Sequence, residues 1–236
     1  MKIATILCRA GSMDNYAYVI TDEETGVSAI IDAPETYPIV QYCDANNLKP
    51  TYLLNTHHHF DHTDSNLDLK RIYNLKIVGA IYDEKRIPGI DETVQEGDIF
   101  KIGNLEAHII KAEGHTTGHI LWYFPREKVV FTGDVLFNLC VGGLFEGTPE
   151  QMFNTLKKVK ALPEDVMFYP GHEYTMQGAN FAAQYCKDEV VLRQYFILAE
   201  TRLRQNLPVC PISLGMEKVC NPYLAAESLD ELKQIV

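Results

Sequence analysis

Short apolar segments rich in β-branched and aromatic residues recur from residue 1 to about residue 170, and Gly, Pro, Asp or Asn separate them. This pattern is typical of strands joined by turns, with a few helices between them. The clearest helix signal lies at 149–161, where Thr148 and Gln151 form a capping box. The expected strands are 3–7, 16–21, 28–32, 52–54, 76–81, 105–111, 119–124, 128–132 and 166–169, and the other expected helices are 37–46 and 65–73.

The pattern changes after His172, where helical segments replace the strands. Helices are expected at 176–186, 189–206 and 229–236, and Ser228 with Glu231 forms a second capping box before the last of them. No low-complexity linker or internal repeat separates the two parts. The chain is therefore expected to contain a mixed α/β (α+β) domain over residues 1–173 and a helical subdomain over residues 174–236.

Composition narrows the class of protein. With 236 residues, 46% of them hydrophobic and 22% charged, the chain is long enough to bury a core as a globular protein. The net charge of −11 disfavours a nucleic-acid partner. Six widely spaced cysteines indicate reduced thiols in the cytoplasm. The start of the chain does not have the pattern of a signal peptide, and no apolar stretch approaches membrane length, so no membrane partner is expected.

The segment Thr56–His62 indicates a metal site. Four of the eight histidines and one carboxylate fall within six consecutive positions, and imidazole nitrogen and carboxylate oxygen are ligands that zinc prefers. A short β-prone run precedes the segment, so it is expected on a loop at the end of a strand. His57 and His59 can point to one side while Asp61 and His62 reach a second position, which suggests two metals. The alternative is a histidine-rich surface loop without a ligand.

Three more ligand-type residues follow expected strands or lie in turns. His115 lies in the turn Gly114–His119, Asp134 follows the strand at 128–132, and His172 follows the strand at 166–169. Each alone is a weak signal, because a lone histidine is more often a hydrogen-bonded core or surface residue. Together with the segment Thr56–His62, they form one set of candidate metal ligands.

The motifs resemble, in order and spacing, those of glyoxalase II, the hydroxyacylglutathione hydrolases of the metallo-β-lactamase superfamily. The first motif alone indicates only the superfamily, which includes lactonases, nucleases and persulfide dioxygenases. Phe-Glu-Gly-Thr and Gly-His-Glu-Tyr-Thr narrow the resemblance to this family, and it covers nearly the whole chain. The matching segments are 14–16, 56–62, 114–119, 132–137, 145–148 and 171–175.

The resemblance implies an αββα sandwich, with a C-terminal helical subdomain that helps to bind the thiol carrier. It also implies two divalent metal ions per chain, zinc first, with iron or manganese as alternatives. Asp61 and Asp134 would be the catalytic carboxylates, with Asp134 bridging the metals. His58 is expected to point away from the metals, His119 is not expected to be a ligand, and His108 is read as structural. The first metal would be held by His57, His59 and His115, and the second by Asp61, His62 and His172.

The activity that the resemblance implies is hydrolysis of a 2-hydroxyacyl thioester, such as S-lactoylglutathione, as in methylglyoxal detoxification. Two cations would supply a hydroxide nucleophile near neutral pH, so no nucleophilic Ser or Cys is needed. The expected partner is a small acyl-thiol, and the expected state is a monomer or weak oligomer.

Carrier recognition departs from the family pattern. A basic residue and a tyrosine of the family are replaced by Gly143 and Phe145, whereas Tyr174 is retained, and these three positions are the substrate-binding candidates. A second basic residue is missing after Asn221-Pro-Tyr223. Cations elsewhere in the C-terminal part could replace the missing ones, namely Arg202, Arg204 and Lys218.

Four alternatives stay open at the level of sequence. A persulfide dioxygenase of the same fold would use one iron, and a full set of residues for a second metal argues against it. A nuclease or phosphodiesterase of the superfamily is disfavoured by the acidic charge. Another hydrolase of the superfamily is a third alternative. A metal-stabilised binding module would not explain seven ligand-type residues.

Overall fold

The computed structural model describes residues 1–186 and 188–235. The chain forms two compact units, the first with residues Met1–Lys111 and Gly118–Glu127, the second with Ala112–Thr117 and the described residues of Lys128–Val236. These units are not divided between residues 173 and 174, where the sequence placed the domain boundary. That boundary stays a prediction. No helix of the described residues is long and apolar enough to cross a membrane.

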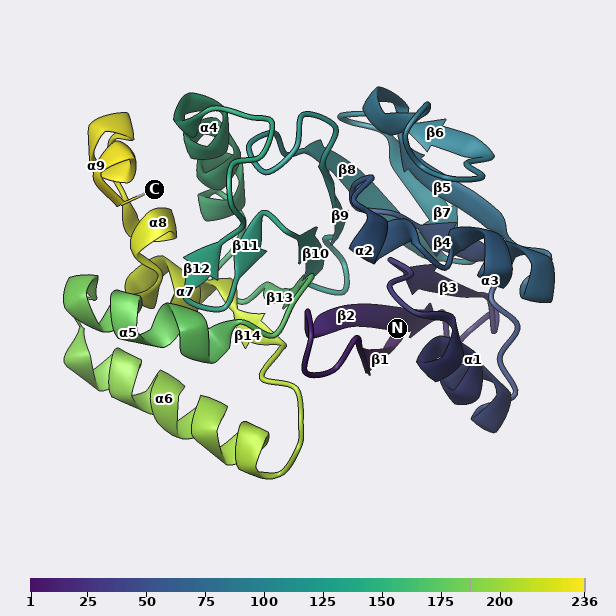
Figure 1. Ribbon diagram of the computed structural model, residues 1–236, viewed down its shortest axis with the longest axis horizontal. Helices are drawn as coiled ribbons and strands as arrows, with labels where there is room; N and C mark the ends of the chain where they lie inside the picture. Colours follow the sequence, from purple (N-terminus) through teal and green to yellow (C-terminus); the bar gives the residue numbers. More distant parts are fainter. Residues whose placement is uncertain (187, 236) are drawn as a thin grey trace. The chain divides into compact units, whose positions relative to one another are not determined.

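The first unit is built on a six-stranded sheet in the order β1-β2-β3-β4-β5-β6. The first three strands are antiparallel, and β3 to β6 run parallel to one another. Helix α1 connects β3 to β4, and helices α2 and α3 lie between β4 and β5 along the chain (Figure 1). The elements are β1 Lys2–Cys8, β2 Asn15–Thr21, β3 Ser28–Ile31, α1 Thr36–Ala45, β4 Tyr52–Leu54, α2 Phe60–Thr63, α3 Asn66–Tyr73, β5 Lys76–Ala80, the 3-10 helix η1 Ile81–Asp83 and β6 Glu92–Val94.

Both faces of this sheet are buried. On one face, Ile30 of β3 and Leu53 of β4 share a hydrophobic cluster with Ile39 of α1 and Leu69 of α3. The opposite face packs against the antiparallel strands β7 Ile99–Ile102, β8 Leu105–Lys111 and β9 Ile120–Phe124. The ring of Tyr52 meets Phe100 edge-on at 5.1 Å between centroids. Two buried faces explain why the central strands are apolar at nearly every position.

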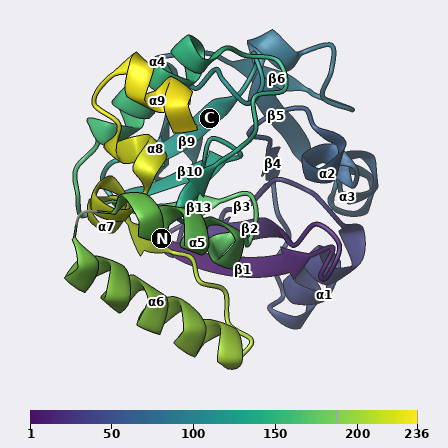
Figure 2. The ribbon, with the colours of Figure 1, turned by 60° about the vertical axis from the view of Figure 1, so that its left-hand side comes forward.

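The second unit combines short strands with six helices among its described residues. Strand β13 pairs in parallel with β10 and antiparallel with β14, and β11 with β12 forms a hairpin. Helices α5 and α6 lie side by side, as Figure 2 shows. The elements are β10 Val129–Gly133, β11 Leu136–Phe137, β12 Cys140–Val141, α4 Pro149–Lys160, β13 Met167–Pro170, α5 Thr175–Tyr185, α6 Glu189–Arg204, β14 Ile212–Ser213, α7 Leu214–Cys220, α8 Pro222–Ala225 and α9 Leu229–Ile235.

All nine expected strands and all six expected helices are present, with ends that shift by up to two residues. The capping box of α4 is confirmed. At α9, Ser228 accepts from the backbone N–H of Glu231 as expected, but the Glu231 carboxylate accepts from the N–H of Glu227. Val236, the expected end of the last helix, lies outside the described residues. The expectation that only helices follow His172 is wrong, because β14 adds to β13.

Candidate metal centre

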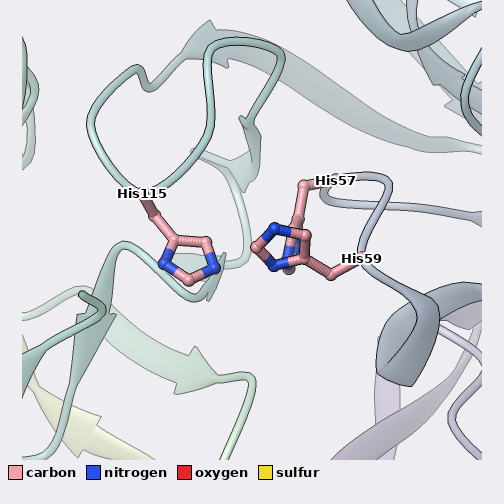
Figure 3. A group of neighbouring side chains, drawn as sticks. All are labelled: His57, His59 and His115. Atoms are coloured by element: carbon pink, nitrogen blue, oxygen red, sulfur yellow. The ribbon is translucent and has the colours of Figure 1, made fainter. Parts of the chain in front are cut away.

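The histidine-rich segment begins one residue after β4 and ends in the short helix α2. Asn55 holds the two ends together, because its side-chain amide donates to the backbone oxygen of His62 at 3.1 Å. His57 and His59 extend from the loop before α2 (Figure 3). Asp61 and His62 lie within α2, so the expectation of a loop throughout the segment is wrong for this pair.

Asp32 and Thr56 orient two of these histidines. Asp32 follows β3 directly, and its Oδ2 lies 2.8 Å from the Thr56 hydroxyl and 2.9 Å from Nδ1 of His62. The Thr56 hydroxyl donates to Asp32, so its oxygen is left to accept from Nδ1 of His57 at 3.0 Å. A carboxylate also only accepts, so Nδ1 carries the proton in both histidines. Their Nε2 atoms are therefore the ones with a lone pair for a metal.

His57 is the centre of this group. Its ring lies 4.7 Å from that of His59 and 4.3 Å from that of His62, measured between centroids. Ligand atoms of Asp61 and His62 lie within 4.8 Å of each other, and the Asp61 carboxylate also accepts from the Asn15 amide at 3.0 Å. His57, Asp61 and His62 are at most 5% exposed. Four nitrogen and oxygen donors therefore converge in the first unit.

The remaining histidines of this region have other partners. Nδ1 of His58 lies 3.3 Å from the buried carboxylate of Asp83, which also pairs with Arg86. The ring of His58 also lies 5.0 Å from that of His59 between centroids, so the expectation that His58 points away from the metals stays a prediction. His119 stacks on His57 with 4.7 Å between ring centroids and 18° between planes, so it fixes the ring of a candidate ligand. His108 lies on β8 and meets the ring of Tyr123 at 6.5 Å.

A second group of donors lies in the second unit, around Asp134. This residue follows β10, and its Oδ2 lies 3.4 Å from Nε2 of His115 and 3.3 Å from Nε2 of His172. All three side chains are at most 5% exposed. One carboxylate oxygen therefore lies within 3.4 Å of two imidazole nitrogens, so three possible metal donors are close together in the second unit.

Backbone contacts hold His115 in this arrangement. Its Nδ1 donates to the backbone oxygen of Gly143 at 2.8 Å, which leaves the Nε2 lone pair toward Asp134. Gly142 allows the approach, because a Cβ there would overlap the Asp134 backbone oxygen and lie 2.9 Å from Nδ1 of His115. Gly114 adopts a φ of +145°, which favours glycine.

Aromatic rings hold His172. Tyr174 stacks on it with 4.7 Å between centroids and 13° between planes, and Phe137 meets it edge-on at 5.6 Å. Phe145 meets the ring of His115 edge-on at 5.2 Å and is itself 73% exposed. The three substrate-binding candidates Gly143, Phe145 and Tyr174 therefore all contact the group around Asp134 through His115 or His172.

Both groups suit divalent cations. They offer only nitrogen and oxygen donors, and Nδ1 of three histidines is occupied by an acceptor, which is how metal-ligating histidines are usually oriented. The donor chemistry fits zinc, iron or manganese alike.

Sequence reasoning missed Asp32, and it named Thr56 and Asn15 only as parts of motifs, without their role in orienting the candidate ligands. A signal existed for Asp32, because a carboxylate that directly follows a strand is positioned like Asp134. Asp83 gave no such signal, since only the fold brings it to His58.

The fold and the two donor groups define a class, the metallo-β-lactamase superfamily, whose family model matches residues 15–172. Residues 173–235 match the model described as hydroxyacylglutathione hydrolase C-terminus. The chain belongs to the hydroxyacylglutathione hydrolase family. The predicted fold class is thereby confirmed as a metallo-β-lactamase fold of mixed sheets and helices with a C-terminal helical region.

Curated relatives carry the same family name. The hydroxyacylglutathione hydrolase of Pelagibacter ubique is 40% identical over 235 residues, covering 100% of this chain and 97% of the relative. That of Chelativorans sp. is 40% identical over 224 residues, covering 95% and 87%.

Two solved structures share the fold. ETHE1 from Myxococcus xanthus has a TM-score of 0.75 at 24% identity, covering 100% of this chain and 89% of that one. TTHA1623, solved in a di-iron-bound form, has a TM-score of 0.61 at 26% identity and covers 70% of this chain and 91% of that one.

Proposed function

We propose that this protein is a metal-dependent thioester hydrolase that splits S-(2-hydroxyacyl)glutathione, or a related acyl-thiol, into a hydroxy acid and a free thiol. The family name of the relatives supports the reaction class. Metal dependence is proposed mainly from the position of Asp134. One of its carboxylate oxygens lies 3.4 Å from Nε2 of His115 and 3.3 Å from Nε2 of His172.

The proposed ligand set joins the two donor groups. His57, His59 and His115 would hold one metal, Asp61, His62 and His172 the other, and Asp134 would bridge them. The di-iron form of TTHA1623 supports two metals in this fold. Zinc is proposed first, with iron or manganese as alternatives, because the donors suit all three.

A pair of bound divalent ions supplies Lewis acidity and a hydroxide near neutral pH. The chain's own residues do the positioning. Asp32 and the Gly143 backbone oxygen keep the proton of His62 and His115 on Nδ1. Asn15 holds the Asp61 carboxylate in place by donating to it, and this carboxylate would also accept a hydrogen bond from a nucleophilic water.

The chain needs no nucleophilic side chain of its own. A thiolate leaves without much help from a general acid, so hydrolysis of a thioester is limited by attack on the carbonyl. Burial raises the pKa of the Cys140 thiol to about 12, so at neutral pH this thiol is protonated and does not compete as a nucleophile.

A role in methylglyoxal detoxification and a cytoplasmic location belong to the same proposal. All six cysteines are free, as expected of a protein in a reducing compartment.

The test combines metal analysis with a thioester assay. Protein purified without chelator is expected to contain two metal ions per chain under metal-replete conditions and to hydrolyse S-lactoylglutathione, with loss of activity on chelation and recovery on metal return. A ceiling of one metal, together with iron-dependent oxygen consumption on a persulfide substrate, would favour the mononuclear dioxygenase instead.

A further inference from the structure

The second unit contains a pocket of about 320 Å³ whose described lining has no charged side chain. Four aromatic rings contribute to it, from Phe137, Tyr174, Phe181 and Tyr223. The rings of Phe181 and Tyr223 stack at 5.6 Å, so α5 and α8 form one wall together. The remaining lining includes Cys140 and Gly143.

This pocket adjoins the donor group around Asp134. Phe137 and Tyr174 contact the ring of His172 from the pocket side, and the Gly143 backbone oxygen accepts from His115. A thioester whose carbonyl reached these histidines would therefore place its thiol carrier against the aromatic wall. This step rests on the proposed function.

The charges that act on the pocket are acidic. The carboxylates of Glu217 and Glu173, after burial, contribute to the raised pKa of the Cys140 thiol. Among the described residues, no cation contributes to this shift.

The three cations that the sequence offered as replacements are held elsewhere in the second unit. The Arg202 guanidinium donates to the backbone oxygens of Val209 and Cys210 at 2.9 and 3.1 Å. Lys218 donates to the backbone oxygen of Leu162 at 2.6 Å.

Arg204, the third cation that could replace the missing basic residues, pairs with Glu200 at 3.2 Å along α6. None of these three is among the residues that line the pocket. These three cations therefore do not replace the basic residues that the chain lacks at Gly143 and after Tyr223.

We propose that the pocket holds the thiol carrier by stacking and apolar contact and does not select a carboxylate at its far end. The substrate class is then 2-hydroxyacyl thioesters of amide-containing thiols, in which a neutral far end is accepted as well as an anionic one. An ionic hydrogen bond to a carboxylate would give a preference of roughly 10–150-fold, and that preference is expected to be missing.

A substitution at Gly143 can introduce a preference for substrates with a carboxylate at the far end of the carrier. A Cβ at this position would meet only the Phe145 ring, at 3.6 and 3.9 Å, which is ordinary contact. Gly143→Lys therefore places a cation at the pocket wall with no backbone strain. Gly143→Gln is the matched control, because it adds a side chain of similar length without charge.

The experiment measures kcat/KM of the metal-loaded protein for S-lactoylglutathione, its glycine amide and S-lactoyl-N-acetylcysteamine. The wild type is expected to treat the acid and the amide within about threefold of each other and to hydrolyse the neutral thioester. Gly143→Lys is expected to favour the acid by about tenfold or more, and Gly143→Gln to keep the wild-type ratio. A wild-type preference for the acid above about tenfold would overturn the inference.

A binding measurement separates this inference from the proposed function. Calorimetric titration with S-hexylglutathione and its glycine amide, neither of which can be hydrolysed, is expected to give dissociation constants within about threefold. If these constants are equal but no thioester is hydrolysed by the metal-loaded protein, the proposed function fails while the carrier pocket stands. If neither thioether binds and the neutral thioester is not hydrolysed, the inference is wrong.

Discussion

Glu217 on α7 is a fully buried carboxyl group whose ionisation the fold opposes. Its oxygens accept from the Tyr195 hydroxyl at 2.5 Å, the Asn221 side-chain amide at 2.8 Å and the backbone N–H of Leu139 at 3.1 Å. Burial nevertheless raises its pKa from 4.5 to about 7, and the three donors oppose only part of the increase. The stability of the second unit should therefore depend on pH through this residue.

The direction follows from proton linkage. The folded state binds the Glu217 proton more tightly than the unfolded chain does, so the stabilisation is fully present below pH 4.5 and is lost as pH rises through about 7. One pKa unit corresponds to about 1.4 kcal/mol, so the full loss is about 3 kcal/mol in the free energy of unfolding. About 1 kcal/mol of it is expected between pH 6 and pH 8.

Glu217→Gln removes the titration and keeps the hydrogen bonds. The amide oxygen can accept from Asn221 and Leu139, and the amide nitrogen can donate to the phenolic oxygen of Tyr195. The variant is therefore expected to gain stability relative to wild type as pH rises, by up to about 3 kcal/mol at pH 8.

The assay is urea unfolding at pH 6 and pH 8, followed by far-ultraviolet circular dichroism, to which the six helices among the described residues of the second unit contribute. Because other groups of the protein also contribute to the pH dependence, the measured quantity is the difference between the two proteins at each pH, in which their contribution cancels. The reasoning is refuted if the variant is the less stable protein at pH 8, or if the difference is the same at both pH values.

Three further predictions concern the donor groups. Asp134→Asn is expected to lower kcat by several orders of magnitude with circular dichroism unchanged, because the two proposed metals would repel each other without the charge of the proposed bridging carboxylate. His108→Gln is expected to keep kcat/KM within about threefold, since this residue lies outside both donor groups; equal damage from the two changes would contradict the ligand assignment. Gly142→Ala is expected to lower both metal content and Tm, because its Cβ would overlap the Asp134 backbone oxygen, whereas Gly143→Ala is expected to change neither. Similar behaviour of the two glycine variants would show that the backbone around Asp134 yields to an added methyl group.

The longer elements could be predicted because their sequence pattern is local. Strands β4 and β8 have the bounds that the sequence predicted, 52–54 and 105–111. Strand β14 could not be predicted in this way, since two residues carry no periodicity and the strand exists only by pairing with β13. Helix α2 was hidden for a related reason, because four residues rich in ligand-type side chains have no apolar stripe.

At the site, residue type was sufficient to identify the candidate ligands but not what orients them. Histidine and aspartate are recognisable by chemistry, so His57, His115 and Asp134 could be found without a structure. The partner of His62 is Asp32, 30 residues earlier in the chain, and only the tertiary fold brings the two together. The same holds for Arg202, whose hydrogen bonds to loop carbonyls remove it as a replacement cation.

Gly142 and Gly143 show how the chain can change its carrier without changing its metal ligands. Gly142 lies so close to the Asp134 backbone oxygen and to His115 that no side chain fits, so this position is fixed by the donor group. Gly143 accepts from the same histidine through its backbone oxygen, while a Cβ at this position would meet only the Phe145 ring at ordinary contact distance. Any residue at Gly143 can keep that hydrogen bond, because the accepting oxygen belongs to the main chain. The side chain there is then free to add or remove a charge at the carrier pocket, which is why a lysine at this position should alter carrier preference and leave the geometry around Asp134 intact.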